Sequence, residues 1–211
     1  RQLVSVNINN NLSVIIGHMG ILSAVMKRKG KGEHCARFLF TFSFQLNKEI
    51  NMLFKANIAL KSVLDITPEL LEGNGIKGLI LDLDNTLTTH DNPKPADGVL
   101  EWIDTMKRAG IKLMIVSNNH DYRVKPFADM LGLQFVSEGR KPLSKGINEA
   151  QIRMNIPFSQ LAVVGDQLFT DILGANLKRI KSIYVKPIEY EEATFFKIKR
   201  KAEKLFLPKD L

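Results

Sequence analysis

The sequence predicts an α/β fold in which a mostly parallel sheet of five strands is covered by helices on both faces, a three-layer, Rossmann-like arrangement. Two observations favour this class. From Met52 onward, apolar runs of strand length alternate with stretches of helical periodicity. The apolar runs also lack regular polar alternation, as expected for strands that helices cover on both sides.

The predicted elements follow one another in strict alternation. The five strands are expected at residues 77–83, 112–117, 133–137, 161–166 and 182–186. Helices are expected between them at 97–109, 121–131, 143–154 and 169–178, with flanking helices at 53–64 and 190–206. Gly110 and Gly132 each follow a helical stretch in the manner of a helix stop. Pro142 is expected in the first turn of the helix at 143–154, where its missing N–H costs nothing.

Length and composition indicate one soluble globular domain with an appendage, since the chain has 211 residues, of which 45% are hydrophobic and 25% charged. The single cysteine, Cys35, cannot form an internal disulfide, which favours a reducing, cytoplasmic setting. The net charge of +8 is concentrated in residues 1–51 and 195–211. Because the central body is nearly neutral, we predict no nucleic-acid partner.

Residues 1–51 lack a convincing periodic pattern. Their longest apolar run, NLSVIIGHMGILSAVM, is shorter than the roughly 20 residues of a membrane span, so no transmembrane segment is expected. Basic residues follow this run, the reverse of a secretory signal. Since the chain begins with Arg1, we expect 1–51 to be a weakly structured or non-native extension, and Met52 to start a domain covering 52–211. A targeting or membrane-surface role for the extension is the alternative.

Polar side chains with catalytic potential stand where four of the strands end. Because the carboxyl ends of parallel strands meet at one edge of a sheet, we expect these side chains to converge in one crevice. They are Asp82, Asp84 and Thr86 in DLDNT, Ser117 and Asn118 in SNN, Lys141 in EGRKP, and Asp166 and Asp171 in GDQLFTD. Asn85, Asn119 and Gln167 stand beside these motifs and either line the pocket or lie there by chance.

The expected cluster of carboxylates points to a metal ion and a phosphoryl group. Like charges at close range raise each other's pKa, and a divalent cation relieves this. Mg²⁺ prefers oxygen ligands and is commonly held by carboxylates together with substrate phosphate. Zinc is a poor candidate, because no Cys or His belongs to the cluster. A lysine and a hydroxyl at the same place suit the equatorial oxygens of a phosphoryl group.

The order of these motifs resembles the haloacid dehalogenase (HAD) superfamily of phosphatases. DLDNT fits D-x-D-x-T after a hydrophobic strand, and VSN, RKP and GDQLFTD follow in the superfamily's order. The resemblance covers about residues 58–187. It implies a HAD fold and a phosphate monoester substrate.

The resemblance also implies a role for each motif residue. Asp82 would be the nucleophile that forms an aspartyl-phosphate, and Asp84 the general acid and base. Lys141 would neutralise the nucleophile and the phosphate. Thr86 would fix the loop at the substrate, and Ser117 would hydrogen-bond the phosphoryl oxygens with Asn118 beside it. Mg²⁺ would be held by Asp82, by Asp84 through its backbone carbonyl, and by Asp166, with Asp171 in support.

Plainer alternatives stand beside several of these assignments. Asp171 could be a helix cap or turn residue. Ser117 and Asn118 could be turn formers, and the GRKP segment could be a solvated loop, with Arg140 rather than Lys141 the doubtful member.

The sequence leaves no room for a cap domain over the site. About ten residues separate Thr86 from the helix expected at 97, and only one helix and one strand fit between Asn119 and Lys141. A separate lid needs more residues than either gap holds. We therefore expect an open site that admits a bulky substrate or one presented on a surface.

Within the superfamily, the motifs are similar to those of the YqeG family of subfamily IIIA. The segments LDLDNTL, SNN, GRKP and GDQLFTD, preceded by a short helix ending in DITPELL (Asp65 to Leu71), carry this resemblance. That family is related to phosphatidylglycerophosphate phosphatases of mitochondria and plastids, which implies removal of the terminal phosphate of phosphatidylglycerophosphate. The alternatives are a phosphatase of a nucleotide, sugar phosphate or phosphoprotein, and a HAD-like binding or assembly module.

The last predicted helix combines aromatic and aliphatic residues with lysines in YEEATFFKIKRKAEKLFL. This composition suits an anionic phospholipid surface and thus a peripheral place at a membrane. The alternative is that its apolar residues pack on the sheet while its lysines face water.

Overall fold

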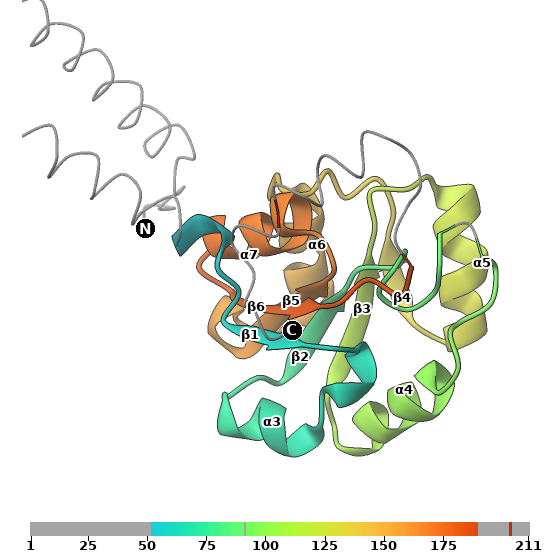
Figure 1. Ribbon diagram of the computed structural model, residues 1–211, viewed down its shortest axis with the longest axis horizontal. Helices are drawn as coiled ribbons and strands as arrows, with labels where there is room; N and C mark the ends of the chain where they lie inside the picture. Colours follow the sequence, from blue (N-terminus) through green and yellow to red (C-terminus); the bar gives the residue numbers. More distant parts are fainter. Residues whose placement is uncertain (1–51, 91, 190–202, 204–211) are drawn as a thin grey trace, which may run out of the picture. The chain divides into compact units, whose positions relative to one another are not determined.

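The computed structural model describes residues 52–90, 92–189 and 203 (Figure 1). The expectations for residues 1–51 and for the basic helix at 190–206 lie outside the described residues, apart from Glu203. That residue is buried, and its carboxylate accepts a hydrogen bond of 3.0 Å from the Leu168 N–H.

A parallel sheet forms the centre of the domain, with strand order β1-β6-β5-β2-β3-β4. Five of its strands are the predicted ones, with ends that differ by at most two residues. These strands are β2 (Gly78–Leu81), β3 (Lys112–Val116), β4 (Gln134–Val136), β5 (Leu161–Gly165) and β6 (Lys181–Val185). The predicted α/β class with a parallel sheet is therefore confirmed, but the sheet has six strands rather than five.

The additional strand, β1 (Ile58–Leu60), shows that the helix predicted at 53–64 is wrong. Residues 52–54 are helical, but the chain then extends along β6 and pairs Ile58 with Ile183. Without β1, the backbone of β6 would be an unpaired sheet edge. The spacing of apolar residues fits a helix, yet pairing with a distant strand overrides this local preference.

Side-chain hydrogen bonds hold β1 in register and end it. The Ser182 N–H donates to Asn57 Oδ1 at 2.9 Å, and the Asn57 N–H donates to Ser182 Oγ at 3.2 Å. Just after β1, the Ser62 hydroxyl accepts from the Leu64 N–H and opens a 3₁₀ turn at Val63–Asp65. The strand is therefore specified by contacts more than 100 residues away along the chain.

Five described helices surround the sheet: α3 (Pro68–Gly73), α4 (Val99–Arg108), α5 (Asp121–Leu131), α6 (Lys145–Met154) and α7 (Leu173–Leu177). The α5 helix has the predicted bounds. Gly110 and Gly132 follow α4 and α5 with φ values of 77° and 59°, which confirms them as helix stops.

The helix predicted at 143–154 begins only at Lys145, so placing Pro142 in its first turn was wrong. Residues 141–144 form a turn instead. The Lys141 N–H donates to Asn118 Oδ1 at 2.7 Å, and the Asn118 amide donates back to the Lys141 carbonyl at 3.0 Å. These bonds use the Lys141 backbone for a contact with the loop after β3.

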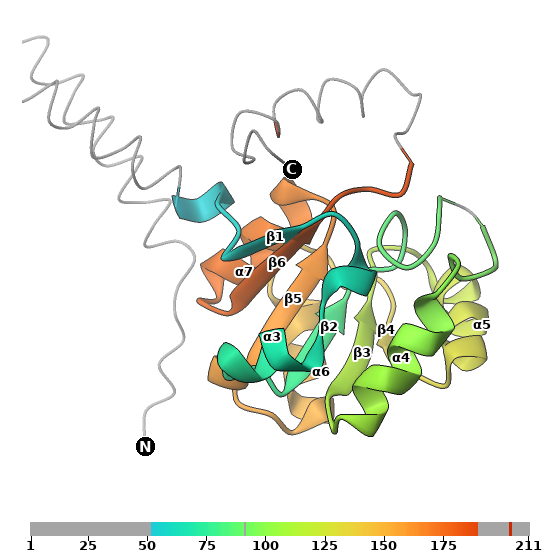
Figure 2. The ribbon, with the colours of Figure 1, turned by 60° about the horizontal axis from the view of Figure 1, so that its bottom comes forward.

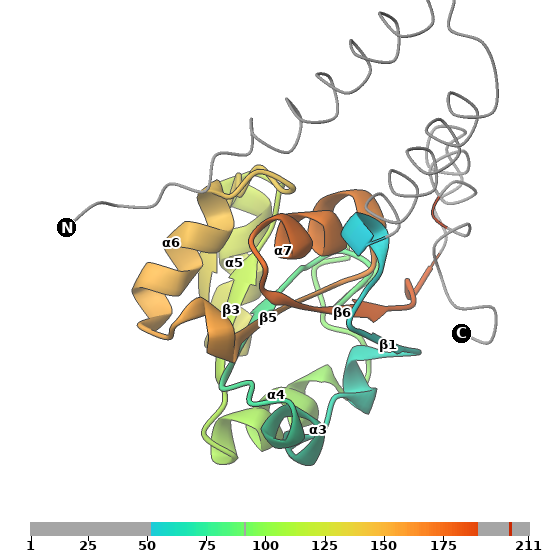
Figure 3. The ribbon, with the colours of Figure 1, turned by 90° about the vertical axis from the view of Figure 1, so that its left-hand side faces the viewer.

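Helices cover both faces of the sheet (Figures 2 and 3), and an apolar core lies on each face. On one face, α3, α4 and α5 pack on side chains such as Leu79 and Leu81 of β2. On the other face, α6 and α7 pack on side chains such as Ile80 of β2 and Val163 of β5. Successive side chains of a strand point to opposite faces, which is why strands buried on both sides are apolar throughout.

The connections of the two central strands run in opposite directions. The chain leaves β2 through α4 to β3 on one side, and leaves β5 through α7 to β6 on the other. A crevice at the carboxyl ends of β2 and β5 is the usual ligand position in such sheets. In the described part of the chain, no helix has the length and apolar character needed to cross a bilayer.

Because of its hydrogen bonds, we predict that Ser182 contributes measurably to the free energy of unfolding. Ser182→Ala removes an acceptor for the Asn57 N–H and a partner of Asn176 Oδ1, which lies 3.1 Å from the hydroxyl. We expect the free energy of unfolding, measured by urea denaturation, to fall by about 1–2 kcal/mol. The exposed Ser159→Ala serves as the control and should change it by less than about 0.5 kcal/mol. Equal values for Ser182→Ala and the parent protein would contradict this account of β1.

Candidate active site

Asp82 stands one residue beyond β2, at the carboxyl edge of the sheet. Its N–H donates to the Val164 carbonyl at 2.9 Å, so the sheet ladder fixes its backbone. Its side chain is almost fully buried and accepts a hydrogen bond of 2.5 Å from Lys141 Nζ. The apolar strand thus holds a charged group in place at its end.

Lys141 bridges two carboxylates inside the site. Its ammonium lies 2.5 Å from Asp82 Oδ1 and 2.7 Å from Asp171 Oδ1, and its side chain is 3% exposed. Burial lowers the pKa of Lys141, but the Asp171 and Asp82 carboxylates outweigh burial and hold that pKa above its usual range. Lys141 is therefore a permanent positive charge, and the solvated-loop alternative for this residue is wrong.

Asp171 reaches the site because of two local features. Residues Leu168–Ile172 form a π-helical turn, in which the Leu173 N–H donates to the Leu168 carbonyl five residues back. Gly165 leaves space for the carboxylate, since a Cβ at this position would lie 2.3 Å from Asp171 Oδ2. Asp171 is fully buried, and besides its bond to Lys141 it accepts from the Gln167 N–H at 3.2 Å.

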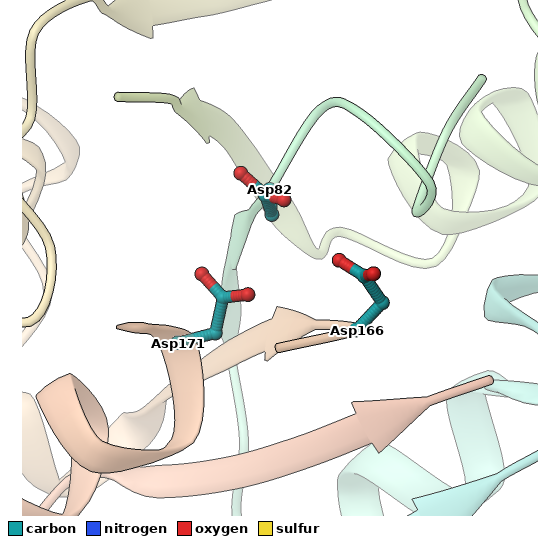
Figure 4. Close-up of side chains that lie close together, drawn as sticks. All are labelled: Asp82, Asp166 and Asp171. Carbon is teal, nitrogen blue, oxygen red and sulfur yellow. The ribbon is translucent and has the colours of Figure 1, made fainter. Parts of the chain in front are cut away.

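Asp82, Asp166 and Asp171 form a buried carboxylate cluster (Figure 4). One oxygen from each lies within 4.8 Å of the others, and the three groups face a common space. Burial raises the pKa of Asp82 to about 7, Lys141 opposes this rise, and Asp171 adds to it. One ammonium against three carboxylates leaves an excess of negative charge in the site.

This donor set fits a hard divalent cation. All three groups offer oxygen atoms, and their spacing lets a single ion contact each of them. Asp82, Asp166 and Asp171, all named from the sequence as metal ligands, would hold Mg²⁺ there. The Asp84 side chain lies outside this cluster, and its backbone carbonyl as a metal ligand stays a prediction.

Both carboxylate oxygens of Asp84 are held by donors. Arg123 Nη2 lies 2.8 Å from Oδ1, and the Asn119 side-chain amide donates to Oδ2. The next residue, Asn85, has a φ of 61°, a left-handed conformation that asparagine tolerates. This bend follows directly after the two aspartates.

A polar cavity of about 210 Å³ opens above these groups. Its wall includes Asp82, Asp84, Lys141, Ser117 and Asn118, so the predicted convergence of strand ends occurs. The Asn118 amide is bonded to the Lys141 backbone, which makes Asn118 a support of Lys141 as well as a wall residue. Ser117 Oγ accepts from the Asn119 N–H at 3.1 Å.

Thr86 does not line the cavity, although it was expected at the substrate. It is buried, and its N–H donates to the Leu83 carbonyl within the loop. This position suits a role in fixing the loop and not direct contact with the substrate.

The sequence did not assign three residues to the site, and of these His90 was interpreted as an ordinary loop residue. His90 and Thr170 line the cavity beside Asn85, Asn119 and Gln167, and Arg123 holds Asp84. Thr170 lies inside the GDQLFTD motif, so the motif itself could have indicated it. Arg123 could have been found from its place in the first turn of the helix that follows SNN, since that turn faces the end of the strand.

Comparison with known proteins places these motifs in context. The haloacid dehalogenase-like hydrolase family matches residues 83–177. The probable phosphatase YqeG of Bacillus subtilis (strain 168) is 40% identical over 148 residues, which cover 70% of this chain and 86% of that protein.

Two further comparisons are more distant. Phosphatidylglycerophosphate phosphatase 1, chloroplastic/mitochondrial, of Arabidopsis thaliana is 25% identical over 148 residues, 66% of this chain and 42% of that protein. The chain thus spans less than half of the plant protein. The crystal structure of an uncharacterized protein from Listeria monocytogenes serotype 4b has a TM-score of 0.47 and 18% identity, covering 56% of this chain and 85% of that chain.

The carboxylate cluster predicts that Mg²⁺ stabilises the protein. An ion at 100 times its Kd that binds only the folded state adds about 2.7 kcal/mol to the free energy of unfolding. We expect a rise in melting temperature when Mg²⁺ is added to EDTA-treated protein. Asp166→Asn should lose most of this rise, whereas Asp129→Asn, a surface carboxylate paired with Lys125, should keep it. The same rise in both variants would rule out this cluster as the ion site.

The rise in melting temperature that Mg²⁺ produces should also depend on pH. Folding raises the pKa of Asp82 from 3.8 to about 7, so in metal-free protein this group makes the free energy of unfolding fall as pH rises between those values. Below pH 7 the ion must displace a proton from Asp82. The melting-temperature gain from Mg²⁺ is therefore larger at pH 8 than at pH 6, and equal gains would argue against Asp82 as a ligand.

Proposed function

This chain belongs to the haloacid dehalogenase-like hydrolases and is a phosphatase of the YqeG family, and on that premise we propose that it hydrolyses a phosphate monoester through a covalent intermediate on Asp82. The observation that carries the proposal is the buried contact between Lys141 and Asp82 at the floor of a polar cavity. A carboxylate beside a fixed ammonium is ionised at lower pH than burial alone would allow. Such a group can attack phosphorus.

In the first step, an Asp82 oxygen forms a bond to phosphorus while the bond from phosphorus to the leaving oxygen breaks. The electron pair of the broken bond stays on the leaving oxygen, and Asp84 gives that oxygen a proton. Lys141 neutralises negative charge on Asp82 and on the phosphoryl group. The products are a free alcohol and an aspartyl-phosphate.

In the second step, a water molecule attacks phosphorus and gives a proton to Asp84. The bond between phosphorus and Asp82 breaks, which releases inorganic phosphate and restores both aspartates. Asp84 thus acts as acid in one step and base in the next, and its place in the cavity wall serves both. When bound by Asp82, Asp166 and Asp171, Mg²⁺ supplies positive charge to the phosphoryl oxygens.

For the substrate, we propose the phosphate of an anionic phospholipid, phosphatidylglycerophosphate, which the plant relative's name specifies for that protein. The cavity of about 210 Å³ is smaller than most ligand pockets and has room for a phosphate with a small polar group. Amide, imidazole and hydroxyl groups of its wall suit the hydroxyls of a glycerol headgroup. The rest of a lipid would remain outside the protein.

Three exposed apolar side chains stand close in the chain, or by a backbone hydrogen bond, to residues that line the cavity, and they favour a lipid. Leu143, 54% exposed, lies two residues after Lys141, and Tyr122, 78% exposed, lies three residues after Asn119. The 43%-exposed Ile188 is tied to the loop after Asp84, since its N–H donates to the Asn85 carbonyl at 3.2 Å. Exposed apolar side chains on the segments that carry a polar site suit a substrate whose phosphate projects from a bilayer.

Asp82→Asn tests the covalent mechanism. The amide cannot attack phosphorus, so phosphate release from 4-nitrophenyl phosphate with Mg²⁺ should fall by about 1,000-fold or more. Acid-quenched protein should contain labelled phosphate only where Asp82 is intact. The pair between Lys141 and Asp171 remains in the variant, so it should still fold, which a melting curve checks. Activity near the parent level in a folded Asp82→Asn variant would end the covalent proposal.

A vesicle assay tests the substrate. With mixed vesicles of phosphatidylcholine and phosphatidylglycerophosphate, kcat/KM should exceed that for glycerol 3-phosphate and 4-nitrophenyl phosphate by about tenfold or more. Leu143→Ser should lower the vesicle rate about fivefold and leave soluble esters unaffected. Ile152→Ser is the matched control, since Ile152 is 72% exposed near the end of α6 that contacts the start of β3. Faster turnover of soluble esters would exclude the lipid while leaving the phosphatase intact.

A further inference from the structure

Arg123, in the first turn of α5, contacts Asp84, the Asn92 carbonyl and the Phe127 ring. One of its nitrogens, Nη2, donates to Asp84 Oδ1 at 2.8 Å and to the Asn92 carbonyl at 2.9 Å. Its guanidinium lies over the Phe127 ring, 5.6 Å from the centroid, and its side chain is 14% exposed. The ring and the two acceptors together fix the position of the guanidinium.

The contacts of Arg123 fix the orientation of Asp84. Because Arg123 holds one oxygen and Asn119 holds the other, the carboxyl plane cannot rotate without breaking a hydrogen bond. Each carboxyl oxygen has a second lone pair, so these contacts leave a position for a transferred proton. Asp84 is thus held toward the cavity by residues that leave its proton-transfer function available.

The same arginine fixes the loop that stands where a cap domain would begin. The Asn92 carbonyl that accepts from Arg123 also lies 3.3 Å from the Thr88 hydroxyl, which donates to the Lys94 carbonyl at 2.5 Å. This loop carries His90, a wall residue of the cavity. One side chain therefore connects the wall with the proposed acid.

The arrangement has a cost that points to function. Arg123 Nε is buried and has no hydrogen-bond acceptor among the described residues. A buried donor without an acceptor costs roughly 1–3 kcal/mol. An arginine placed only for stability would be expected to satisfy this donor.

We propose that Arg123 is a positioning residue for proton transfer to the leaving oxygen, and that it acts through Asp84. The inference rests on the proposed role of Asp84 as general acid. When an alkyl ester is cleaved, the leaving oxygen receives the electron pair of the broken bond and the proton of Asp84. A 4-nitrophenolate leaves as a stable anion and depends little on that proton. Loss of Arg123 therefore slows alkyl esters selectively.

The test compares two leaving groups in four enzymes. Rates of the first turnover are measured for glycerol 3-phosphate and 4-nitrophenyl phosphate with the parent protein, Arg123→Gln, Arg123→Lys and Asp84→Asn. For Arg123→Gln we expect the alkyl ester to slow by about tenfold to a hundredfold, with the aryl ester within about threefold and KM nearly constant. Arg123→Lys keeps the charge but not the planar group, so it should recover part of the alkyl rate.

Asp84→Asn separates failure of this inference from failure of the proposed mechanism. If Asp84→Asn slows both esters equally, Asp84 is not the acid for the leaving oxygen, and the proposed mechanism is wrong at that step. If Asp84→Asn is selective for the alkyl ester but Arg123→Gln is not, the positioning role of Arg123 is wrong. Should Arg123→Gln fail to fold, the same comparison with Arg123→Lys decides. Arg153→Gln, a surface arginine paired with Glu149, should leave both rates unchanged.

Discussion

The contact of the Lys141 ammonium with two buried carboxylates is the constraint on which the rest of this structure depends. Three charged groups removed from water cost free energy that only close contacts offset. The lysine enters from a turn rather than a helix, and Asn118 holds that turn by bonding its backbone in both directions. Asp171 approaches β5 at a residue without a side chain. Several departures from regular secondary structure thus serve the same contacts.

The sheet brings together segments that lie far apart in the sequence, which local hydrogen bonds cannot do. Asp82 and Asp166 follow adjacent strands whose onward connections diverge, so no crossing helix covers the space between them. Apolar strands buried on both faces resist movement of the residues at their ends. Charged groups at such ends are therefore held at fixed separations even when their mutual repulsion favours moving apart. A site for a metal and a phosphate is what this arrangement suits.

Most of this fold and site could be predicted, and the failures have identifiable physical reasons. Five of the six strands, β2 to β6, are mostly apolar runs, and the motifs at their ends are local in sequence, so both could be identified from the sequence. The edge strand at Ile58–Leu60 was not, because its apolar spacing fits a helix and only Ser182 and its neighbours select the extended form. The start of α6 was misplaced because a contact with Asn118 displaces the helix from Pro142. Arg123 was missed because it belongs to no motif, and its contacts with Asp84 and the Asn92 carbonyl depend on how the loop folds.

The π-helical turn at Leu168–Ile172 has a consequence for how this protein can change. Its five-residue spacing, rather than any side chain within it, sets the direction in which Asp171 points. Deleting one residue would convert the turn to ordinary helical pitch and rotate the carboxylate by about 100° around the axis. The segment between Gly165 and Asp171 is therefore more tolerant of altered composition than of altered length. Insertions and deletions, which surface loops elsewhere in the domain absorb, would here separate the lysine from its second carboxylate.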